Sequence, residues 1–306
     1  MLLISSPRFQ EHTTPPGHPE RPERAEAFDR IAAAWRERGG RVVEPRPATR
    51  EELLRVHDEA YVSSIDAVDG RAAMLDADTF TSPESVEIAR LAAGAAIQAA
   101  EHALDTGETA FALVRPPGHH AERDKAMGFC LFNNVAVAAA AAVARGLSRV
   151  AVVDIDVHHG NGTQWTFYGD PHVFYMSMHE FPLYPGTGAA DETGTGAGRG
   201  FTLNLPLPAG ARDADYERAC RVMADALDRF SPQLLLVSAG FDAHADDPLA
   251  SMRVSTEGYA RVVEILKAAA RRAGCPMALV TEGGYDLDAL GACVEASIRV
   301  LADDAI

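Results

Sequence analysis

The sequence predicts an α/β fold in which a mostly parallel sheet is covered by helices on both faces. Short apolar runs alternate with segments of helical periodicity along most of the 306 residues, and this alternation is typical of a parallel sheet. The apolar run at 150–153 has no polar interruption, as expected of a strand buried on both sides. Acidic residues and histidines follow that run directly, at the place where open parallel sheets bind ligands.

The first third of the chain is predicted to hold a loop and three helices. Residues 10–24 contain four prolines and a glycine and are expected to form a loop. Helices are expected over 23–38 and 51–68. A third helix should begin with Ser82 as its N-cap and Pro83 at its first position, and should run to about residue 104.

The remaining two thirds alternate between strands and helices. Strands are predicted at 109–114, 150–154, 172–178, 201–207, 233–238 and 277–281. Helices are predicted at 133–145, 214–230, 259–270 and 287–301. The glycine-rich stretch 185–200 matches no phosphate-binding motif and is expected to be a mobile surface loop. No linker or repeat divides the chain, so a single domain is predicted over 1–306.

Composition excludes several classes of protein. The formal net charge of −16 argues against direct nucleic-acid binding, which depends on Lys and Arg, and is compatible with cationic substrates. The four cysteines form no Cys-x-x-Cys pair, so neither a disulfide framework nor a thiolate zinc site is expected. No signal segment or run of transmembrane length is present. A cytoplasmic protein with no membrane partner is predicted.

The residues after the strand at 150–153 have the character of metal ligands. Side chains alternate along an extended chain, so Asp154, Asp156 and His158 project to the same side. Carboxylates with an imidazole form a zinc-like ligand set, and catalytic zinc keeps one position open. The alternative is a polar turn after a strand, but two acids on one side repel each other unless a cation or hydrogen-bond donors separate them.

Polar clusters follow four of the predicted strands. His119 and His120 follow one strand, Asp156 and His158 follow another, and Asp242 and Tyr285 follow the last two. The carboxyl ends of parallel strands share one edge of a sheet. The sequence therefore predicts that these clusters meet in one crevice.

Six motifs carry a resemblance to a known family. They are Gly17-His-Pro-Glu-Arg-Pro-Glu-Arg24, Pro116-Pro-Gly-His-His120, Asp154-x-Asp-x-His-His-Gly-Asn-Gly162, Phe181-x-x-Tyr-Pro-Gly-Thr-Gly188, Ser238-Ala-Gly-Phe-Asp242 and Glu282-Gly-Gly-Tyr285. Together they resemble the zinc-dependent histone deacetylase family over residues 12–290. The first motif and Asn161 resemble its class II and bacterial histone deacetylase-like amidohydrolase branch.

The resemblance implies a fold and a cofactor. The fold would be an arginase/deacetylase-like three-layer α/β/α arrangement with an eight-stranded, mostly parallel sheet. Asp156, His158 and Asp242 would hold Zn²⁺. Because two carboxylates and one imidazole form a hard ligand set, Fe²⁺ is an alternative occupant.

The resemblance also implies catalytic roles. His120 would be the main general base and His119 would act mostly through its charge. Asp154 would pair with His119 and Asn161 with His120, and because an asparagine supplies no charge, the two imidazoles should differ in basicity. Tyr285 would donate its hydroxyl to the developing oxyanion.

Further residues are assigned by the same resemblance. Those of the substrate passage are Phe129 with its neighbour Gly128, Tyr184, the rim carboxylate Asp78 and the gatekeeper Leu249. A structural K⁺ is expected beside Asp154, Asp156, His158, Ser177 and Met178. Arg24 is expected at the acetate exit. Core packing is the alternative for the two aromatic residues.

Several functional alternatives stay open from the sequence. The substrate implied by the resemblance is acetylated lysine in a peptide or protein, or a small acylated amine such as an acetylated polyamine. Leu249 favours acyl-lysine or a neutral small amide, because it offers no counter-charge to a second ammonium. The motif Asp242-Ala-His-Ala-Asp246 also resembles the two-manganese site of arginase-type ureohydrolases, with His244 and Asp246 as ligands. A non-catalytic acyl-lysine binding protein is a third alternative. The oligomeric state is open, with a dimer and a tetramer as candidates.

Overall fold

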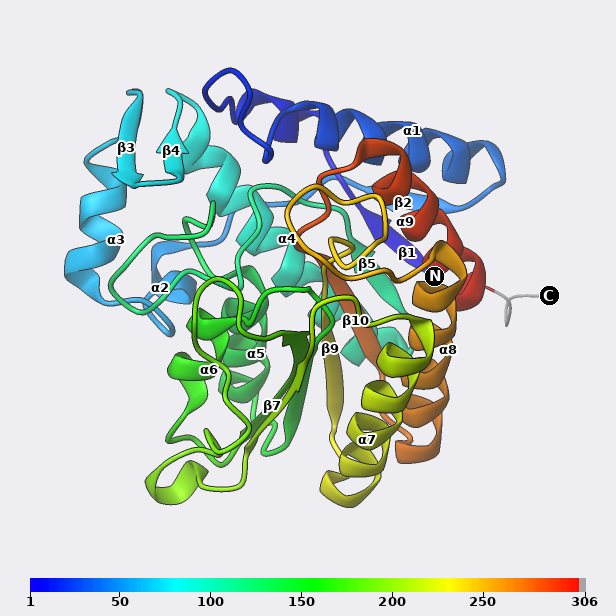
Figure 1. Ribbon diagram of the computed structural model, residues 1–306. Helices are drawn as coiled ribbons and strands as arrows, with labels where there is room; N and C mark the ends of the chain where they lie inside the picture. Colours follow the sequence, from blue (N-terminus) through cyan, green and yellow to red (C-terminus); the bar gives the residue numbers. More distant parts are fainter. Residues whose placement is uncertain (303–306) are drawn as a thin grey trace.

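One parallel sheet organises the structure, a computed structural model in which residues 1–302 are described (Figure 1). Within these residues the sheet has eight strands in the order β2-β1-β5-β10-β9-β6-β7-β8, and every adjacent pair is parallel. The strands are β1 Leu2–Ile4, β2 Arg41–Val43, β5 Ala110–Ala112, β6 Val150–Asp154, β7 Val173–Glu180, β8 Thr202–Leu207, β9 Leu234–Ala239 and β10 Met277–Thr281. A separate hairpin pairs β3 Ala73–Asp76 with β4 Thr79–Thr81. The predicted α/β fold with a parallel sheet is confirmed.

Helices cover both faces of this sheet and give it three layers (Figure 1). The α-helices among the described residues are α1 Glu23–Glu37, α2 Arg50–Leu53, α3 Glu59–Asp66, α4 Ser85–Thr106, α5 Asn134–Ala144, α6 Asn161–Phe167, α7 Asp213–Phe230, α8 Thr256–Ala273 and α9 Leu287–Ala302. Helices α3, α4 and α5 pack in one core, and α1, α7, α8 and α9 pack in the other. Strand β6 shows how the sheet divides them, because Val150 and Val152 enter the first core while Ala151 and Val153 enter the second.

The topology brings the polar clusters together. The four strands that precede them, β5, β10, β9 and β6, are consecutive neighbours in the sheet. Since all four run in the same direction, the residues that follow them emerge at one edge. The predicted convergence therefore depends on the order of the strands in the sheet, which the sequence did not predict.

The helix predicted over 51–68 is divided into α2 and α3. Between them, His57 is buried and its Nε2 accepts a hydrogen bond from the Asn133 amide (3.0 Å). Its Nδ1 therefore carries the proton and donates to the main-chain oxygen of Glu122 (2.9 Å). The Asp58 amide donates to the Arg123 carbonyl (2.9 Å). The chain leaves the helical path here because it bonds to the loop that follows the histidine pair.

The predicted start of α4 is also wrong, because the helix begins at Ser85 rather than after an N-cap at Ser82. The Ser82 hydroxyl donates to the Glu11 carbonyl (3.1 Å) and accepts from the Thr13 amide (3.1 Å). Ser82 thus holds the N-terminal loop instead of capping a helix. The short elements β1, β2, β3, β4 and α6 were not predicted from the pattern of residues, since three to seven residues carry little periodicity.

The N-terminal loop is fixed by a buried ionic network. Glu20 lies between Arg115, at 2.7 Å and 2.9 Å, and Arg24, at 3.1 Å, and all three side chains have no exposed surface. Arg115 also donates to the carbonyls of Phe9 and His12 (2.6 Å each). A proline-rich segment therefore has a defined position against the sheet edge. Within residues 1–302, no helix combines the length and the apolar character needed to span a bilayer.

Two glycines inside helices provide a matched test of the packing. A Cβ at Gly94 of α4 would lie 1.8 Å from the Arg46 carbonyl oxygen, whereas a Cβ at Gly291 of α9 would meet no atom within 4 Å. We expect Gly94→Ala to lower the free energy of unfolding by about 1–3 kcal/mol through overpacking. We expect Gly291→Ala to raise it by about 0.5–1 kcal/mol, because alanine favours the helix. Urea unfolding measures both, and an unchanged midpoint for Gly94→Ala would contradict this close packing.

Candidate metal centre

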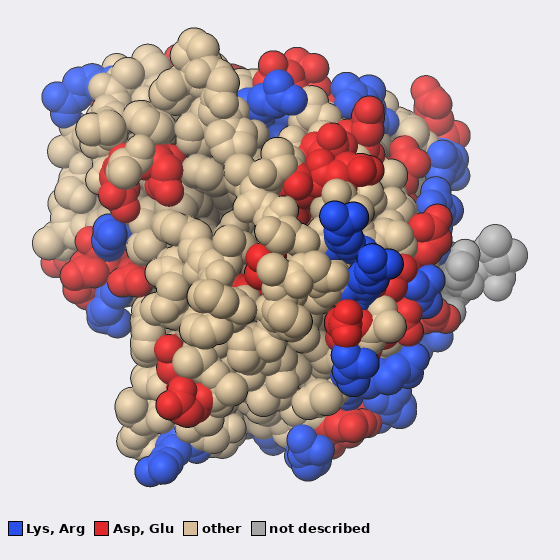
Figure 2. Space-filling model, in the orientation of Figure 1, with Lys and Arg blue, Asp and Glu red and all other residues tan. Residues whose placement is uncertain are grey.

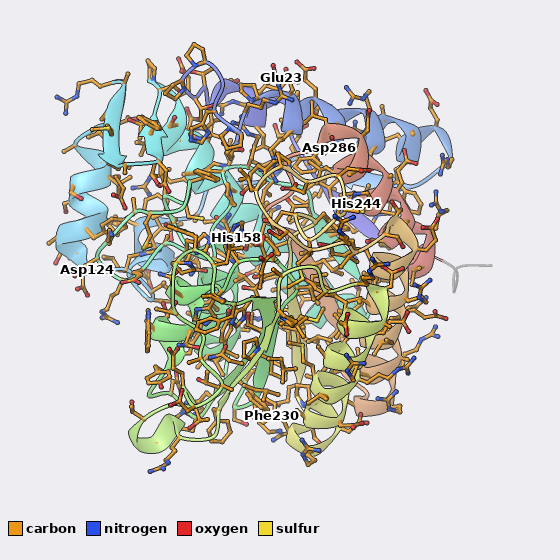
Figure 3. All side chains as sticks on the ribbon, viewed as in Figure 1. Glu23, Asp124, His158, Phe230, His244 and Asp286 are labelled. Carbon is orange, nitrogen blue, oxygen red and sulfur yellow. The ribbon has the colours of Figure 1, made fainter. Side chains whose placement is uncertain are left out.

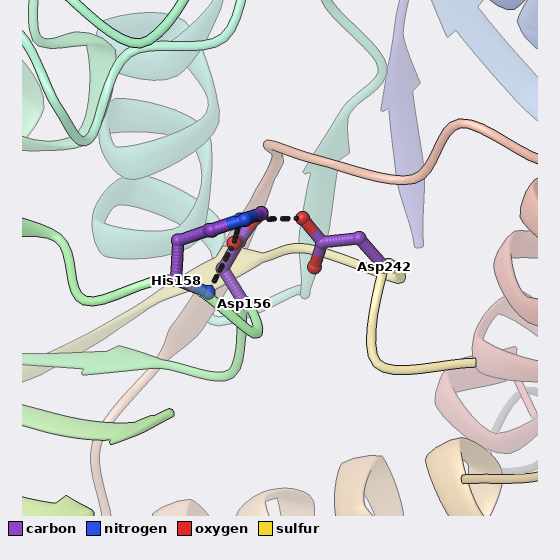
Figure 4. A group of neighbouring side chains, drawn as sticks. All are labelled: Asp156, His158 and Asp242. Atoms are coloured by element: carbon purple, nitrogen blue, oxygen red, sulfur yellow. Dashed lines mark hydrogen bonds and ion pairs between the residues drawn. The ribbon is translucent and has the colours of Figure 1, made fainter. Parts of the chain in front are cut away.

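Asp156, His158 and Asp242 meet at the carboxyl edge of the sheet (Figure 4). One ligand atom from each lies within 4.8 Å of the others, and all three residues are buried. His158 Nδ1 is 3.2 Å from Asp156 Oδ1 and 3.1 Å from Asp242 Oδ2. Among the described residues this is the one group of three or more His, Cys, Asp or Glu side chains with metal-binding spacing.

The electrostatics of the three residues fit a divalent cation. Burial and the neighbouring charge of Asp156 raise the pKa of Asp242 to about 7. Burial acts to lower the pKa of His158, but the carboxylates of Asp156 and Asp242 outweigh it and raise this pKa to about 10. The two carboxylates therefore require positive charge between them. A proton on His158 or a metal ion with carboxylate and imidazole ligands meets that need.

Backbone groups hold the carboxylates in place. Asp156 accepts hydrogen bonds from the amides of His158 (2.9 Å) and Gly283 (2.8 Å), and Asp242 accepts one from the Val157 amide (2.9 Å). A Cβ at Gly240 would lie 2.0 Å from Asp156 Oδ2, and one at Gly283 would lie 2.1 Å from Asp242 Oδ2. These two positions therefore require glycine because the carboxylates occupy the space of a side chain.

The histidine pair lies beside this cluster. His119 and His120 are buried, with their ring centres 4.0 Å apart. His119 Nδ1 is 3.0 Å from Asp154 Oδ2, and His120 Nδ1 is 2.7 Å from Asn161 Oδ1. The structure thus forms both pairs that the family resemblance implied.

The two imidazoles differ in basicity. Burial acts to lower the pKa of His119, but the carboxylates of Asp156 and Asp154 outweigh it and raise this pKa well above its usual value. Burial lowers the pKa of His120, and positive charge on His119 and His158 lowers it further. The surroundings therefore favour positive charge on His119 more than on His120.

Tyr285 faces the same region from the end of β10. Its ring centre is 5.7 Å from that of Phe129, and the Arg24 guanidinium carbon is 5.1 Å from the Tyr285 ring. Burial raises the pKa of the Tyr285 phenol well above its usual value, so the hydroxyl remains a donor. Arg24 donates to the Gly284 carbonyl (2.7 Å) and to the Glu282 carbonyl, which fixes it behind the tyrosine loop.

The two predicted aromatic residues lie outside the core. Tyr184 is 39% exposed, and its ring centre is 5.1 Å from that of His120 and 6.2 Å from that of His158. Phe129 is partly buried and packs against Tyr285. Core packing does not account for either ring, because Tyr184 lies against His120 and His158, and Phe129 lies against Tyr285.

The rim residues are connected to this aromatic wall. Asp78 Oδ1 accepts from the Gly128 amide (3.2 Å), and the Phe129 amide donates to Thr79 Oγ1 (3.0 Å). Phe129 has a φ of +70°, a strained value for a side-chain-bearing residue, so these bonds hold an unfavourable backbone conformation. Leu249 and Tyr285 line a cavity of about 500 Å³ together with the N-terminal loop.

The surface in front of the site is hollowed. His158 lies near the centre of the view in Figure 3, and the same region of Figure 2 is recessed. Uncharged and acidic side chains surround most of this recess, while the lysines and arginines on this face lie around its periphery and are most numerous on the right-hand side of the view (Figure 2). The visible positive charge therefore lies away from the recess.

The residues expected at a K⁺ site lie together. Asp154 of β6 is the register partner of Ser177 of β7, and Met178 follows it in the same strand. Both strand ends are buried. Ser177 Oγ is within hydrogen-bonding distance of His179 Nδ1 (2.9 Å).

The second metal set of a ureohydrolase is not formed within residues 1–302. His244 Nε2 is 3.3 Å from Thr256 Oγ1, and its Nδ1 accepts from the Asp246 amide (3.2 Å). The Asp246 side chain is 73% exposed. His244 and Asp246 lie outside the group formed by Asp156, His158 and Asp242, so the interpretation as a two-manganese site is wrong for this geometry.

The sequence interpretation missed four residues. Glu282 accepts from the amides of Gly118 (2.6 Å) and His119 (3.1 Å), and Asp247 accepts from the Tyr285 amide (2.7 Å). Glu122 accepts from the Asn161 side chain (2.6 Å). The ring centre of His18 is 4.7 Å from that of Phe129. All four lie within or beside the quoted motifs, which was the one clue that the sequence offered.

Comparisons with known proteins agree with this geometry. The family described as the histone deacetylase domain matches residues 18–301. The histone deacetylase-like amidohydrolase of Pseudomonas aeruginosa is 46% identical over 245 residues, which cover 78% of this chain and 64% of that protein. A crystal structure of the HDA15 HD domain has a TM-score of 0.92 at 38% identity and covers 100% of this chain and 92% of its own. The acetylpolyamine aminohydrolase from Burkholderia pseudomallei has a TM-score of 0.89 at 32% identity, with coverage of 99% and 98%.

Asp242→Asn tests the fit of a cation to this site. The folded-state pKa of Asp242, about 7, lies above its usual 3.8, so in metal-free protein this group costs stability increasingly as the pH rises from 3.8 to 7. We expect the metal-free variant to melt above the metal-free parent at pH 8, by roughly 2–4 °C for each kcal/mol of repulsion removed. The difference should vanish near pH 4.

Added Zn²⁺ should reverse that order, because the variant lacks one ligand. Differential scanning calorimetry with and without the metal measures both effects. An equal rise in melting temperature for parent and variant on adding Zn²⁺ would show that Asp242 holds no ion.

Proposed function

The chain belongs to the histone deacetylase family, in its bacterial-type branch, and we propose that it hydrolyses the amide of an acylated amine by metal-dependent catalysis. The observation that carries the proposal is the meeting of three candidate ligands and a histidine pair at the ends of adjacent strands, with Tyr285 on the loop that follows β10. Asp156, His158 and Asp242 are the proposed ligands. When bound, Zn²⁺ polarises the amide carbonyl and lowers the pKa of the attacking water. Fe²⁺ also suits two carboxylates and one imidazole.

His120 is the proposed general base. Its Nδ1 is engaged by Asn161 (2.7 Å), and its pKa is low, so Nε2 is free to accept a proton. As the water oxygen bonds to the amide carbon, its proton moves to His120 Nε2. The same imidazolium then donates that proton to the amine nitrogen as the C–N bond breaks. The second proton of the water also passes to the amine, so the products are a carboxylate and an ammonium group.

His119 and Tyr285 stabilise the charge that develops. The carboxylates of Asp154 and Asp156 keep His119 positively charged beside the reaction centre. The Tyr285 hydroxyl donates to the oxygen that becomes an oxyanion, and such a donor is worth on the order of 10²–10³ in rate. Asp247 holds the tyrosine loop through the Tyr285 amide (2.7 Å).

Acetylated lysine in a peptide or protein is the proposed substrate class. Phe129 and Tyr184 would line the passage for its methylene chain, with Gly128 and Asp78 at the rim. Leu249 offers no counter-charge to a second ammonium, which disfavours a polyamine. Acetylated polyamines are the second candidate because of the similarity to an acetylpolyamine aminohydrolase over almost the whole of both chains.

Three further assignments complete the proposal. A structural K⁺ would bind beside Asp154, Asp156, His158, Ser177 and Met178, where buried oxygen atoms lie at the ends of β6 and β7. Arg24 would border the exit of the carboxylate product, since its buried guanidinium lies behind Tyr285. The chain would act in the cytoplasm, and its net charge of −16 is compatible with peptides that carry positive charge outside the acetylated lysine.

His120→Ala and Tyr285→Phe test the two catalytic roles. We expect each to lower kcat on an acetyl-lysine peptide by about 10² or more, because a proton acceptor or an oxyanion donor is lost. His172→Ala, at an exposed histidine, and Tyr168→Phe, at the end of α6, are matched controls and should keep parental turnover. Near-parental kcat in either site variant, with an unchanged melting temperature, would refute the assigned role.

Leu249→Glu tests the choice of substrate. A carboxylate at the rim supplies the counter-charge that a second ammonium needs. The ratio of kcat/KM for acetylputrescine to that for a neutral acetyl-lysine peptide should therefore rise about tenfold, equivalent to about 1.4 kcal/mol. Steady-state assays on both substrates, with Zn²⁺- and Fe²⁺-loaded protein, measure it. An unchanged ratio would place Leu249 away from the bound amine.

A further inference from the structure

His120 is linked to a carboxylate through one intervening amide. Asn161 Oδ1 is 2.7 Å from His120 Nδ1, and Asn161 Nδ2 donates to Glu122 Oε1 at 2.6 Å. Asn161 is 1% exposed at the start of α6, and Glu122 lies in the turn that follows the histidine pair. The side chains form a chain in the order His120, Asn161, Glu122.

The carboxylate determines which way the asparagine faces. An ionised carboxylate only accepts hydrogen bonds, so it requires the amide NH₂ of Asn161. The carbonyl oxygen of Asn161 must then face His120, and that oxygen accepts only a donor. His120 Nδ1 must therefore carry the proton, and Nε2 keeps its lone pair.

The other acceptors near Asn161 Nδ2 would fix the orientation of the amide less strongly than Glu122 does. Its Nδ2 is also 3.5 Å from the His120 carbonyl and 3.4 Å from Met127 Sδ. The first distance is long for an N–H···O bond, a thioether sulfur is a weak acceptor, and both acceptors are uncharged. Among the described contacts of the Asn161 side chain, Glu122 is the charged one.

Glu122 is itself held in place by its backbone. Its amide donates to the Lys125 carbonyl (2.9 Å) and its carbonyl accepts from His57 Nδ1 (2.9 Å). The tertiary contact that divides α2 from α3 therefore also fixes the residue that orients Asn161.

We propose that Glu122 is a positioning residue which, through Asn161, holds His120 in the tautomer that has the proton on Nδ1 and a free Nε2. The catalytic value of this tautomer rests on the proposed function of His120 as base. The arrangement contrasts with that of His119, where Asp154 bonds the imidazole directly at 3.0 Å. A direct carboxylate favours a cationic imidazole, whereas an interposed amide orients His120 without placing a full charge against it.

Exchanging the two polar groups tests the proposal. Glu122→Gln removes the requirement for an amide NH₂, so we expect kcat to fall about tenfold or more, as for other residues that orient a catalytic histidine, with little change in KM. Asn161→Asp places two carboxylates against each other and should also lower kcat. In the double variant the new glutamine donates to the new aspartate, which again accepts from His120 Nδ1, so the Nδ1–H tautomer should return and kcat should exceed that of either single variant. It should stay below the parental kcat, because a full negative charge then lies against His120.

The tautomer of His120 gives a readout that does not require turnover. The ¹⁵N shifts of its imidazole, assigned by comparison with His120→Ala, should show Nδ1–H alone in the parent and a mixture of tautomers in Glu122→Gln. This measurement tests the positioning role of Glu122 separately from the proposed hydrolase function. If the parent has Nδ1–H but is inactive, the proposed function is refuted and the positioning role of Glu122 stands. Asp124→Asn removes an exposed carboxylate from the same turn (Figure 3) and should leave kcat and the tautomer unchanged.

Two results would overturn the inference. One is a Glu122→Gln variant with parental kcat and a single Nδ1–H tautomer. The other is a double variant whose loss is the product of the single losses, since independent sites combine in that way. If Glu122→Gln does not fold, the double variant is the test: the inference requires it to have the Nδ1–H tautomer and a higher kcat than Asn161→Asp.

Discussion

Four carboxylates buried at one edge of the sheet are the constraint on which the site depends. Asp154, Asp156, Asp242 and Glu282 have no exposed surface, and burying such charges is unfavourable unless each is paired or hydrogen-bonded. Backbone amides satisfy Asp156, Asp242 and Glu282, and His119 pairs with Asp154. The remaining negative charge between Asp156 and Asp242 surrounds His158 Nδ1. A cation at this point resolves the repulsion that the fold creates.

The same edge is held from outside by a second buried network. Glu20 joins Arg115, which begins the loop of the histidine pair, to Arg24, which bonds the carbonyls of the tyrosine loop. The N-terminal segment is thereby linked to two loops that carry proposed catalytic groups. Removal of one partner would leave an unpaired buried charge, which is far costlier than the loss of a surface ion pair.

The sequence predicted the parts of the site that depend on strand ends. A parallel sheet places every strand end at one edge, so the alternation of strands and helices predicted that the polar clusters containing Asp156, His158 and Asp242 would meet there. The choice of these three residues as the ligands came from the family resemblance. It did not predict the division of the helix at His57, because that break is caused by hydrogen bonds to residues 122 and 133, far along the chain. Glu122 was missed for the same reason. Its role depends on a contact with Asn161, which the order of residues does not reveal.

The central claim is that one divalent ion binds where Asp156, His158 and Asp242 meet. A crystal structure of Zn²⁺-loaded protein, with anomalous data collected on both sides of the zinc absorption edge, tests it most directly. We expect one anomalous peak per chain at this point, about 2.0–2.2 Å from His158 Nδ1 and from an oxygen of each aspartate. Two bridged metal peaks, or a peak away from these three side chains, would contradict the account.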